Sequence, residues 1–416
     1  MEIKRDLYLS KLIRKQKNGL IKVVTGIKGC GKSYLLFHLF HDHLLKSGMP
    51  PDHLIEIALD DDRIAELRDP DAILQFLLNA IQDQQVYCIL LDEVQRLNEF
   101  EDILNTLLHI RNADVYVTGS HARGLSSDII TEFRGRGDEI RIHPLKFSEY
   151  LPACGEEPKA AWDNYLKYGG LPQLLAIEDP GAREDCLKSL LQEEYLPGIA
   201  LRCGLQRRDK LGALLEVLAA APDRCTSSLE LSRSLAGMKD TALSDKTIKR
   251  YTDCLAEAFL ISRSARCGIR NKRRSRSLSR YYFEDIGLKN ACMGFSLDQP
   301  RLMADIICSE LRIRGCHVGA GMMEHCEASP GGRRQKKQLE VDFIATRGSE
   351  KYYLQSVSSL HDIERAEQAL HSLVSIRDSF KKIVVVGDDI RIRRNEDGIN
   401  TIGLLSFLLD ENSLNL

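Results

Sequence analysis

The sequence predicts an α/β fold in which a parallel sheet is followed by a helical lid and two smaller domains. Short apolar strands alternate with helix-period segments over residues 1–150, and a glycine-rich turn joins the first strand to the first helix. After about residue 209 the pattern changes to short helices. Alternating strands and helices are typical of a parallel sheet. A chain of 416 residues is also too long for a single core.

The N-terminal alternation starts with an amphipathic helix at residues 7–17 and an apolar run that ends at Thr25. Residues 86–91 are six consecutive apolar residues, as in a strand that is buried on both faces. In such a sheet the ligand binds beyond the carboxyl ends of the strands. The further expected strands are 53–59, 86–91, 114–118 and 138–143, and the expected helices are 71–84, 100–110 and 126–133.

The turn after the first strand reads Gly-x-x-x-x-Gly-Lys-Ser, from Gly26 to Ser33. Its glycines allow backbone N–H groups to point at phosphate oxygens, and the following helix N-terminus favours negative charge. Lys32 can reach the β- and γ-phosphates, and Ser33 can ligate Mg²⁺. We therefore expect ATP and Mg²⁺ as cofactors. The expected nucleotide-binding residues are Gly26, Ile27, Lys28, Gly29, Cys30, Gly31, Lys32, Ser33 and Tyr34.

Two adjacent acids, Asp92 and Glu93, follow the buried strand 86–91. Beside a phosphate loop, Asp92 is expected to hold Mg²⁺ together with Ser33, and Glu93 is expected to activate the attacking water. The alternative is that the two acids only cap the next helix. Ser120, at the end of the next strand, is the expected sensor of the γ-phosphate, although an ordinary turn explains it as well.

Arg134 and Arg136 lie near the end of the helix that precedes the last strand of this module. In oligomeric ATPases an arginine at this place reaches the neighbouring subunit's site and neutralises charge on the γ-phosphate. Arg136 is the first choice and Arg134 the second. Both also suit a solvated helix C-terminus, and this alternative stays open. An arginine acting in this way requires a homo-oligomer, for which a hexamer is one candidate.

The composition fits a protein of the cytoplasm. Hydrophobic residues make up 43% of the chain and charged residues 28%, as in soluble globular proteins. No apolar run approaches 18 residues, so we expect no membrane span. The twelve cysteines are scattered and include no C-x-x-C pair. They are expected to be reduced thiols, not a disulfide framework or a zinc site.

Three helices are expected at residues 211–220, 227–235 and 244–259, after lid helices at 162–168 and 181–202 with a loop at 196–198. The third helix exposes Lys246, Lys249 and Arg250, as in a winged helix whose third helix enters a major groove. A helical module that packs on its neighbours is the alternative.

Residues 263–280 carry eight basic residues and no acid, at the place expected for the wing. In a chain of net charge -2, such a cluster favours contact with several phosphates over a merely solvated loop. The expected DNA contacts here are Arg270, Lys272, Arg273, Arg274 and Arg276, and they favour backbone contact without sequence readout.

Together these motifs resemble one prokaryotic group of AAA+ ATPases. The resemblance rests on the phosphate loop, Leu91-Asp92-Glu93, Thr118-Gly119-Ser120, Arg134-Gly135-Arg136, and the segments 144–150 and 168–172. In this group a P-loop AAA+ sheet with a helical lid precedes a winged helix and a C-terminal domain of unknown function. The resemblance implies domains at 1–150, 151–205, 206–285 and 286–416, the last with a restriction-endonuclease-like core.

The C-terminal domain is expected to be a degenerate nuclease. Its strands are expected at 339–345, 352–357 and 382–386, and its helices at 300–314 and 362–376. Nucleases of this fold need an acid and then Glu-x-Lys on the next strand to bind a metal. Here Asp342 supplies the acid, but the next strand has Gln355 and Val357 in place of the glutamate and lysine. Glu310 is a further acid nearby, and the loop before Leu339 adds Arg333, Arg334, Lys336 and Lys337.

These expectations combine into an oligomeric, Mg²⁺-dependent ATPase that binds duplex DNA, preferably branched or forked. The choice of DNA form follows from analogy between folds. One alternative is an ATP-controlled switch or scaffold for a protein partner in host defence. An active nuclease is the other.

Overall fold

The computed structural model describes residues 3–120, 137–221, 224–237, 242–269, 274–328 and 334–416. They form two compact units. The first contains Met1–Pro144 with the short segments Leu171–Gln173 and Glu257–Phe259, and the second contains the rest. Across these described ranges, no helix is both long enough and apolar enough to cross a membrane.

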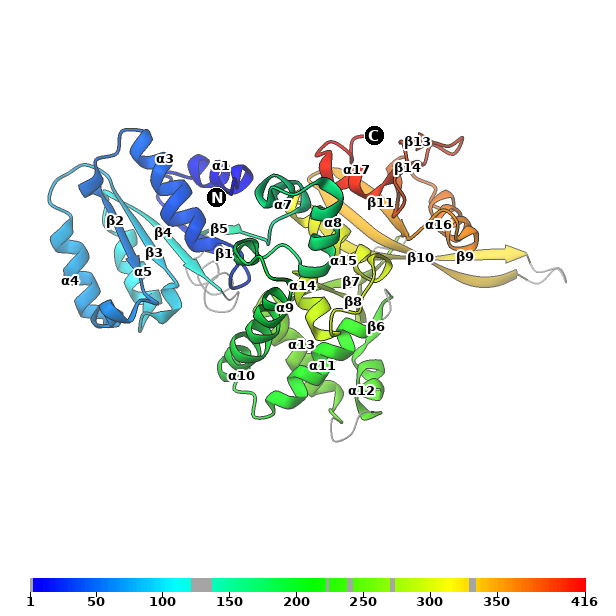
Figure 1. Cartoon of the computed structure of the whole chain (residues 1–416), viewed down its shortest axis with the longest axis horizontal. Coiled ribbons are helices and arrows are strands. Elements are labelled where there is room, and N and C mark those ends of the chain that lie inside the picture. Colours follow the sequence, from blue (N-terminus) through cyan, green and yellow to red (C-terminus); the bar gives the residue numbers. More distant parts are fainter. Residues whose placement is uncertain (1–2, 121–136, 222–223, 238–241, 270–273, 329–333) are drawn as a thin grey trace. The chain divides into compact units, whose positions relative to one another are not determined.

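A five-stranded sheet lies at the centre of the first unit, with the order β2-β3-β4-β1-β5 and every pair parallel (Figure 1). The predicted parallel sheet is therefore confirmed. Its strands are β1 (Ile21–Thr25), β2 (Leu54–Ala58), β3 (Tyr87–Asp92), β4 (Ala113–Gly119) and β5 (Gly137–Arg141). The helical segments are α1 (Asp6–Arg14), α2 (Lys32–Tyr34), η1 (Leu35–Phe40), α3 (His41–Lys46), η2 (Pro51–His53), η3 (Asp62–Arg68), α4 (Pro70–Ala80), η4 (Val94–Arg96) and α5 (Phe100–Leu108).

Strand β3 is buried at every position, as its apolar run predicts. Its Ile89 and Leu91 belong to one apolar cluster with residues of α4 and α5. Helix α4 begins where the Asp69 side chain accepts hydrogen bonds from two backbone N–H groups. It ends at Ala80, before the predicted end at residue 84. The helix predicted at residues 126–133 lies outside the described residues.

The second unit begins with helices. They are α7 (Phe147–Cys154), α8 (Pro158–Tyr168), α9 (Pro180–Ser189), η6 (Leu190–Tyr195), α10 (Leu196–Arg202), α11 (Arg208–Ala220), α12 (Ser228–Ala236) and α13 (Asp245–Glu257). The segment η5 (Pro172–Ala176) lies between α8 and α9 in the chain. The loop predicted at residues 196–198 is wrong, because α10 begins at Leu196. The backbone is helical on both sides of Pro197, because the π-helical turn η6 continues directly into α10.

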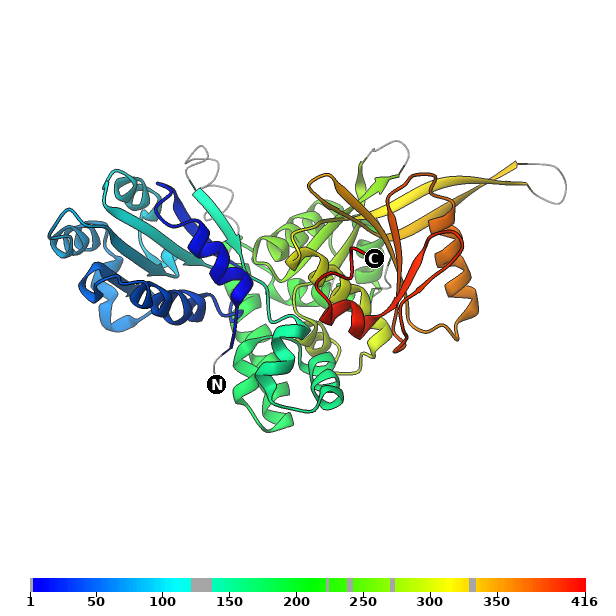
Figure 2. The ribbon, with the colours of Figure 1, turned by 90° about the horizontal axis from the view of Figure 1, so that it is seen from above.

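A nine-stranded sheet of order β13-β14-β12-β11-β10-β9-β7-β8-β6 forms the rest of the second unit (Figure 2). Its strands are β6 (Thr226–Ser227), β7 (Ile261–Gly268), β8 (Arg274–Phe283), β9 (His317–Ala328), β10 (Arg334–Arg347), β11 (Glu350–Val357), β12 (Lys381–Val386), β13 (Arg393–Arg394) and β14 (Asn400–Gly403). The accompanying helices are α14 (Ile286–Cys292), α15 (Gln299–Ile313), α16 (Ile363–Val374) and α17 (Leu404–Leu409). Strands on both sides of residue 285 therefore share one sheet.

The longest strand pair, β9 with β10, differs from the prediction. We expected a loop before Leu339, but β10 begins at Arg334, so Arg334, Lys336 and Lys337 lie in a strand. They pair with β9, from Arg334 opposite Ala328 to Lys337 opposite His325. Arg333 lies outside the described residues. The sequence gives little sign of β9, because its glycines, alanines and glutamates are weak strand formers.

Candidate nucleotide-binding and catalytic site

The phosphate loop connects the end of β1 to the start of α2 and requires glycine at two positions. Gly26 has a φ of +155°, and a Cβ there would lie 2.4 Å from the carbonyl oxygen of Ile142 and 2.9 Å from Cys30 Sγ. Gly31 has a φ of +97° and is the residue that precedes α2. Residues other than glycine rarely adopt such backbone conformations. The loop therefore curves tightly at the carboxyl edge of the sheet, as the Gly-x-x-x-x-Gly-Lys-Ser spacing predicts.

Lys32 lies under this loop and is only 4% exposed. Its ammonium group donates hydrogen bonds to the carbonyl oxygens of Gly26 (3.2 Å) and Ile27 (3.3 Å) and to Ser120 Oγ (2.9 Å). It also lies 3.8 Å from the Glu93 carboxylate. The loop lysine, the predicted sensor and the predicted base are thus gathered at one point.

Glu93 is held from several directions. Ser120 Oγ donates a hydrogen bond to Glu93 Oε1 at 2.7 Å, and the side-chain amide of Gln95 donates to Glu93 Oε2. The Glu93 backbone N–H donates to Thr118 Oγ1 at 2.9 Å. Its φ of +51° lies in the left-handed region, which is uncommon for residues other than glycine and concentrates at functional sites. The carboxylate is therefore fixed beside Lys32 instead of capping the next helix, since its side chain makes no cap hydrogen bond.

Asp92 ends β3 as a buried carboxyl group, 3% exposed. The Thr118 hydroxyl donates a hydrogen bond to it. Burial raises the pKa of Asp92, and hydrogen bonds from Ser33 and Thr118 act in the opposite direction. Ser33 and Asp92, predicted to hold the metal, are thus neighbours. A hydroxyl and a carboxylate are oxygen ligands of the kind that Mg²⁺ prefers, so this pair fits the cation.

Two contacts to the loop were not predicted, although one of them comes from Pro172, in the segment 168–172 that carries part of the family resemblance. A Cβ on Gly29 would lie 3.4 Å from Gln173 Oε1, and one on Gly31 would lie 3.6 Å from Pro172 Cγ. Tyr34, predicted to bind nucleotide, accepts a hydrogen bond from the backbone N–H of Ile3 at 3.2 Å. No local spacing predicts these neighbours, because they lie about 30 to 140 residues away from the loop in the chain.

Arg134 and Arg136, which we expect to reach the site of a neighbouring subunit, lie outside the described residues.

Lys246 and Lys249 are exposed on α13, as predicted. Arg250 is also exposed, but its guanidinium donates to the carbonyl oxygens of Cys203 (2.5 Å) and Gly204 (3.3 Å) after α10. Arg250 therefore also stabilises the contact between two helices.

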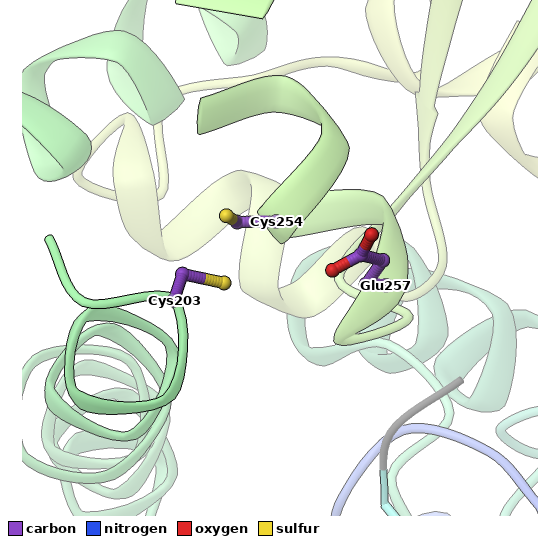
Figure 3. Close-up of side chains that lie close together, drawn as sticks. All are labelled: Cys203, Cys254 and Glu257. Atoms are coloured by element: carbon purple, nitrogen blue, oxygen red, sulfur yellow. The ribbon is translucent and has the colours of Figure 1, made fainter. Parts of the chain in front are cut away.

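The thiols of Cys203 and Cys254 lie within 4.8 Å of each other in the second unit (Figure 3). Cys203 follows α10, and Cys254 lies on α13, one turn before Glu257. A structural zinc site usually has four ligands, so two thiols and one carboxylate are too few. We assign no metal to this group.

The basic segment 263–280 contains fewer free charges than we expected. Arg280 is buried and forms ion pairs with Asp342 (3.1 Å) and Glu340 (3.6 Å), while Arg263 lies 3.7 Å from Asp253. The expectation of eight uncompensated cations is therefore wrong for these two. Of the predicted DNA contacts, Arg274 and Arg276 lie in β8, and the others, Arg270, Lys272 and Arg273, lie outside the described residues.

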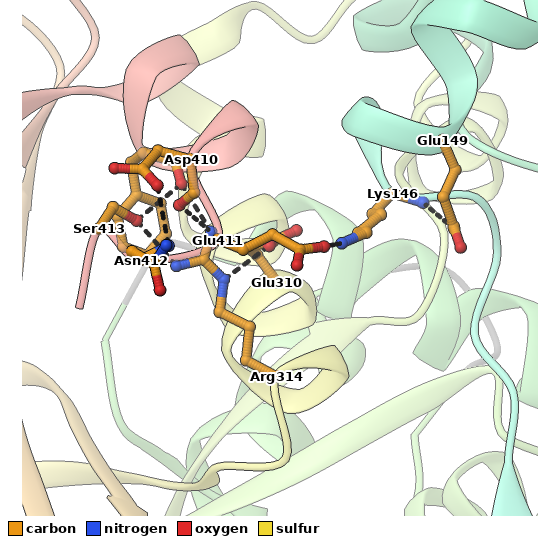
Figure 4. A network of polar contacts seen from close by, with 9 residues as sticks. Lys146, Glu149, Glu310, Arg314, Asp410, Glu411, Asn412 and Ser413 are labelled. Atoms are coloured by element: carbon orange, nitrogen blue, oxygen red, sulfur yellow. Dashed lines mark hydrogen bonds and ion pairs between the residues drawn. The ribbon is translucent and has the colours of Figure 1, made fainter. Parts of the chain in front are cut away.

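Asp342, the acid of the nuclease-like motif, already has protein partners. Besides Arg280, it accepts hydrogen bonds from the backbone N–H and the hydroxyl of Ser356, both at 2.8 Å. Glu310 is buried and pairs with Arg314 at 2.7 Å, within a network that also includes the C-terminal Ser413 (Figure 4). Burial raises the pKa of Glu310, and Arg314 opposes this rise. Both acids are therefore engaged in contacts within the fold.

Comparisons with known proteins agree with this geometry for the first unit. Residues 18–151 match the family model described as an AAA domain. The chain contains a P-loop AAA+ module. Residues 159–299 match a second model, described as a domain of unknown function (DUF8612).

Two similar proteins extend over nearly the whole chain. An uncharacterized protein of Haemophilus influenzae is 27% identical over 414 residues, which are 98% of each chain. An uncharacterized protein of Methanocaldococcus jannaschii is 23% identical over 404 residues, covering 93% of this chain and 86% of that protein. Among solved structures, the Aeropyrum pernix ORC1 protein in complex with DNA covers 71% of this chain and 93% of its own, with 12% identity and a TM-score of 0.32. A score this low supports no conclusion about function.

Proposed function

We propose that this protein is an oligomeric, Mg²⁺-dependent ATPase that binds duplex DNA. One observation carries the catalytic half of this proposal, namely that Lys32, Ser120 and Glu93 form one connected group under the phosphate loop. Asp92 and Ser33 lie beside it. ATP fits the loop because its glycines leave the backbone free to surround phosphate oxygens.

Each residue of this group has a separate role in the proposed hydrolysis. Lys32 exchanges the carbonyl oxygens of Gly26 and Ile27 for the phosphate oxygens of bound nucleotide, so that a buried cation keeps anionic or polar partners throughout. Glu93 accepts a proton from the attacking water, while Ser120 holds one oxygen of this carboxylate. Mg²⁺, which Ser33 and Asp92 would hold, supplies positive charge to the phosphates.

The proposal also includes an arginine from a neighbouring subunit, with Arg136 as first choice and Arg134 as second. Its support is their place in the sequence, at the end of the predicted helix 126–133. Such an arginine stabilises charge on the γ-phosphate in the transition state. Activity should then depend on protein concentration.

The DNA half of the proposal rests on the exposed Lys246 and Lys249 of α13 and on the basic hairpin β7–β8. A helix with exposed cations beside a basic hairpin suits the phosphates of a duplex, as in a winged helix. We further propose that the C-terminal part does not cleave DNA. Asp342 is paired with Arg280, and Gln355 stands where a metal-binding carboxylate is needed.

A scaffold for a protein partner is the second candidate. It is favoured by the engagement of Arg250, Arg263 and Arg280 within the second unit, since cations that stabilise a fold do not indicate nucleic acid.

Salt-titrated binding to a forked and a blunt duplex separates the two candidates. The proposal expects affinity to fall steeply with salt, and Lys272→Gln with Arg273→Gln and Arg274→Gln to weaken binding without changing ATP affinity. A flat salt response, or no binding, favours the scaffold. Incubation of the same DNA with Mg²⁺ or Mn²⁺ should produce no cuts, and cuts would contradict the proposed loss of nuclease activity.

A further inference from the structure

The segment 168–172 carries part of the family resemblance, but none of its residues takes part in the proposed hydrolysis. It follows from the end of α8, and Pro172 and Gln173 lie against the phosphate loop. The chain passes from the second unit to the first at the peptide bond between Gly170 and Leu171, and it returns after Gln173. The segment therefore connects residues packed in the second unit to residues that contact the loop.

Asp285 holds the backbone of this segment. It is 3% exposed and precedes α14. Its Oδ1 accepts a hydrogen bond from the backbone N–H of Leu288 at 3.0 Å, and its Oδ2 accepts one from the backbone N–H of Gly170 at 2.8 Å. The first bond caps α14. The second joins residues 115 positions apart in the chain, so it has no part in the cap and instead fixes Gly170.

Three glycines bring the segment and the start of α14 into direct contact. A Cβ on Gly169 would collide with Asp285 Oδ1, and one on Gly287 would collide with the last carbonyl oxygen of α8. A Cβ on Gly170 would collide with the carbonyl oxygen of Leu145, whose backbone N–H donates to the Gly170 carbonyl at 2.8 Å. Because no side chain lies between these backbones, they are packed too closely to move independently.

Two side chains that follow the held glycine lie on the phosphate loop. A Cβ on Gly31 would lie 3.6 Å from Pro172 Cγ, and one on Gly29 would lie 3.4 Å from Gln173 Oε1 and 3.9 Å from Gln173 Nε2. These are van der Waals distances. Gln173 follows Gly170 by three positions, and Pro172 fixes one backbone dihedral of this short connection. The backbone at Gly170 therefore determines where both side chains meet the loop.

We propose that Asp285 is a positioning residue for the phosphate loop. Through its hydrogen bond to Gly170 it holds Pro172 and Gln173 against the loop, and they keep the loop curved before nucleotide binds. A loop already in its binding conformation has a higher affinity, because no binding energy is used to order it. Asp285 acts through the segment, so its effect is on ATP affinity and not on the chemical step. This inference rests on the proposed ATPase function and adds a residue of the second unit that controls its affinity for ATP.

The test compares alanine variants of two aspartates that both cap helices of the second unit. Asp285→Ala removes the cap of α14 together with the bond to Gly170. Asp179→Ala is the control, because Asp179 caps α9 in the same way, by accepting from the Ala182 N–H at 2.7 Å. Gln173→Ala removes a side chain that contacts the loop and leaves the bond from Gly170 to Asp285 in place. Isothermal titration calorimetry measures ATP affinity, and phosphate release measures kcat, both well below the unfolding temperature of each variant.

Asp285→Ala and Gln173→Ala should each bind ATP about 3- to 10-fold more weakly, the loss expected when one hydrogen bond or an equivalent contact is removed. Their kcat should change by about twofold at most, because Glu93 and Ser120 are unaffected. The control, Asp179→Ala, should lose stability but keep the ATP affinity of the wild type. The variant with both changes should bind ATP no more weakly than Asp285→Ala alone, because the two residues act in series.

Asp285→Ala with the same ATP affinity as Asp179→Ala would overturn the inference, and so would effects of Asp285→Ala and Gln173→Ala that multiply in the double variant. Either result leaves the proposed ATPase function intact if the wild type hydrolyses ATP. A wild type that binds no ATP would overturn both. Should Asp285→Ala not fold, Asp285→Asn replaces it, with Asp179→Asn as its control, and the same results decide. The amide has a single oxygen, so it cannot accept from both Gly170 and Leu288.

Discussion

Ser120 Oγ lies 2.7 Å from Glu93 Oε1 and 2.9 Å from the ammonium group of Lys32. One hydroxyl therefore links the phosphate-loop lysine to the carboxylate that we propose as the base. The two residues follow neighbouring strands, because β3 ends at Asp92 and β4 ends at Gly119 and the two strands are parallel. The sheet topology thus creates the site from residues 27 positions apart in the chain.

Ser120→Ala should lower the rate of ATP hydrolysis by about 10- to 100-fold, since a hydrogen bond to a charged group contributes about 1.5–3 kcal/mol. The affinity for ATP should change little, because the phosphates are held by the loop. Steady-state kinetics measure the rate of hydrolysis, and binding of a fluorescent nucleotide measures the affinity. Ser47→Ala, in the same unit but after α3, is the control. Equal rates for the two variants would exclude Ser120 from the mechanism.

Gly26→Ala should abolish nucleotide binding. A Cβ at Gly26 would lie 2.4 Å from the carbonyl oxygen of Ile142, so the loop backbone must shift. Gly19→Ala is the matched control, because Gly19 also has a positive φ (+73°) but a Cβ there meets nothing within 4 Å. It should cost only about 1 kcal/mol of stability and leave binding unchanged. Isothermal titration calorimetry measures the affinity of both variants for ATP. Equal affinities would contradict the proposed role of the loop.

Asp285 should make the second unit less stable as the pH rises from about 4 to 6. It is buried, it accepts a hydrogen bond from the backbone N–H of Gly170 at 2.8 Å, and burial raises its pKa to about 6. In the unfolded chain the pKa is about 3.9. The native state therefore binds more protons between these values, and the stability present below pH 4 is lost as the pH rises through 6. The expected loss is about 3 kcal/mol.

Asp285→Asn should remove this loss, because an amide does not ionise. Urea unfolding of the second unit at pH 4.5, 5.5 and 6.5 measures it, with Asp298→Asn as the control, since Asp298 precedes α15 without a side-chain cap. A variant whose stability falls with pH as steeply as that of the wild type would show that the loss comes from groups other than Asp285.

Asp342→Asn should destabilise the second unit by about 3–5 kcal/mol, because it leaves the buried Arg280 without its closest carboxylate. Changing Arg280 and Asp342 together, to Met and Leu, should cost less than either single change. Urea unfolding of the two single variants and the double variant gives the coupling energy. A coupling near zero would show that the pair does not stabilise the fold.

The sequence predicted the parallel sheet, and it named the residues that lie together at the centre of the candidate site, because the evidence for both is local. The spacing from Gly26 to Ser33 and the acids after a buried strand each occupy one short segment. The contacts of Pro172 and Gln173 with the loop could not be predicted, because the fold brings them from more than 130 residues away. The ion pair of Arg280 with Asp342 was missed for a similar reason, because it depends on the order of the strands in the sheet, which the charges in the sequence do not indicate. Strand β9 was missed because its glycines, alanines and glutamates are weak strand formers.

The most direct test measures inorganic phosphate released from ATP and Mg²⁺ by the wild type and by Glu93→Gln, at high protein concentration and with and without duplex DNA. The wild type should release phosphate only with Mg²⁺ present. Glu93→Gln should bind ATP with unchanged affinity and release phosphate about 10²- to 10⁴-fold more slowly, because the amide accepts no proton. A wild type that releases no phosphate under any of these conditions, or a Glu93→Gln variant as fast as the wild type, would contradict the proposed ATPase site.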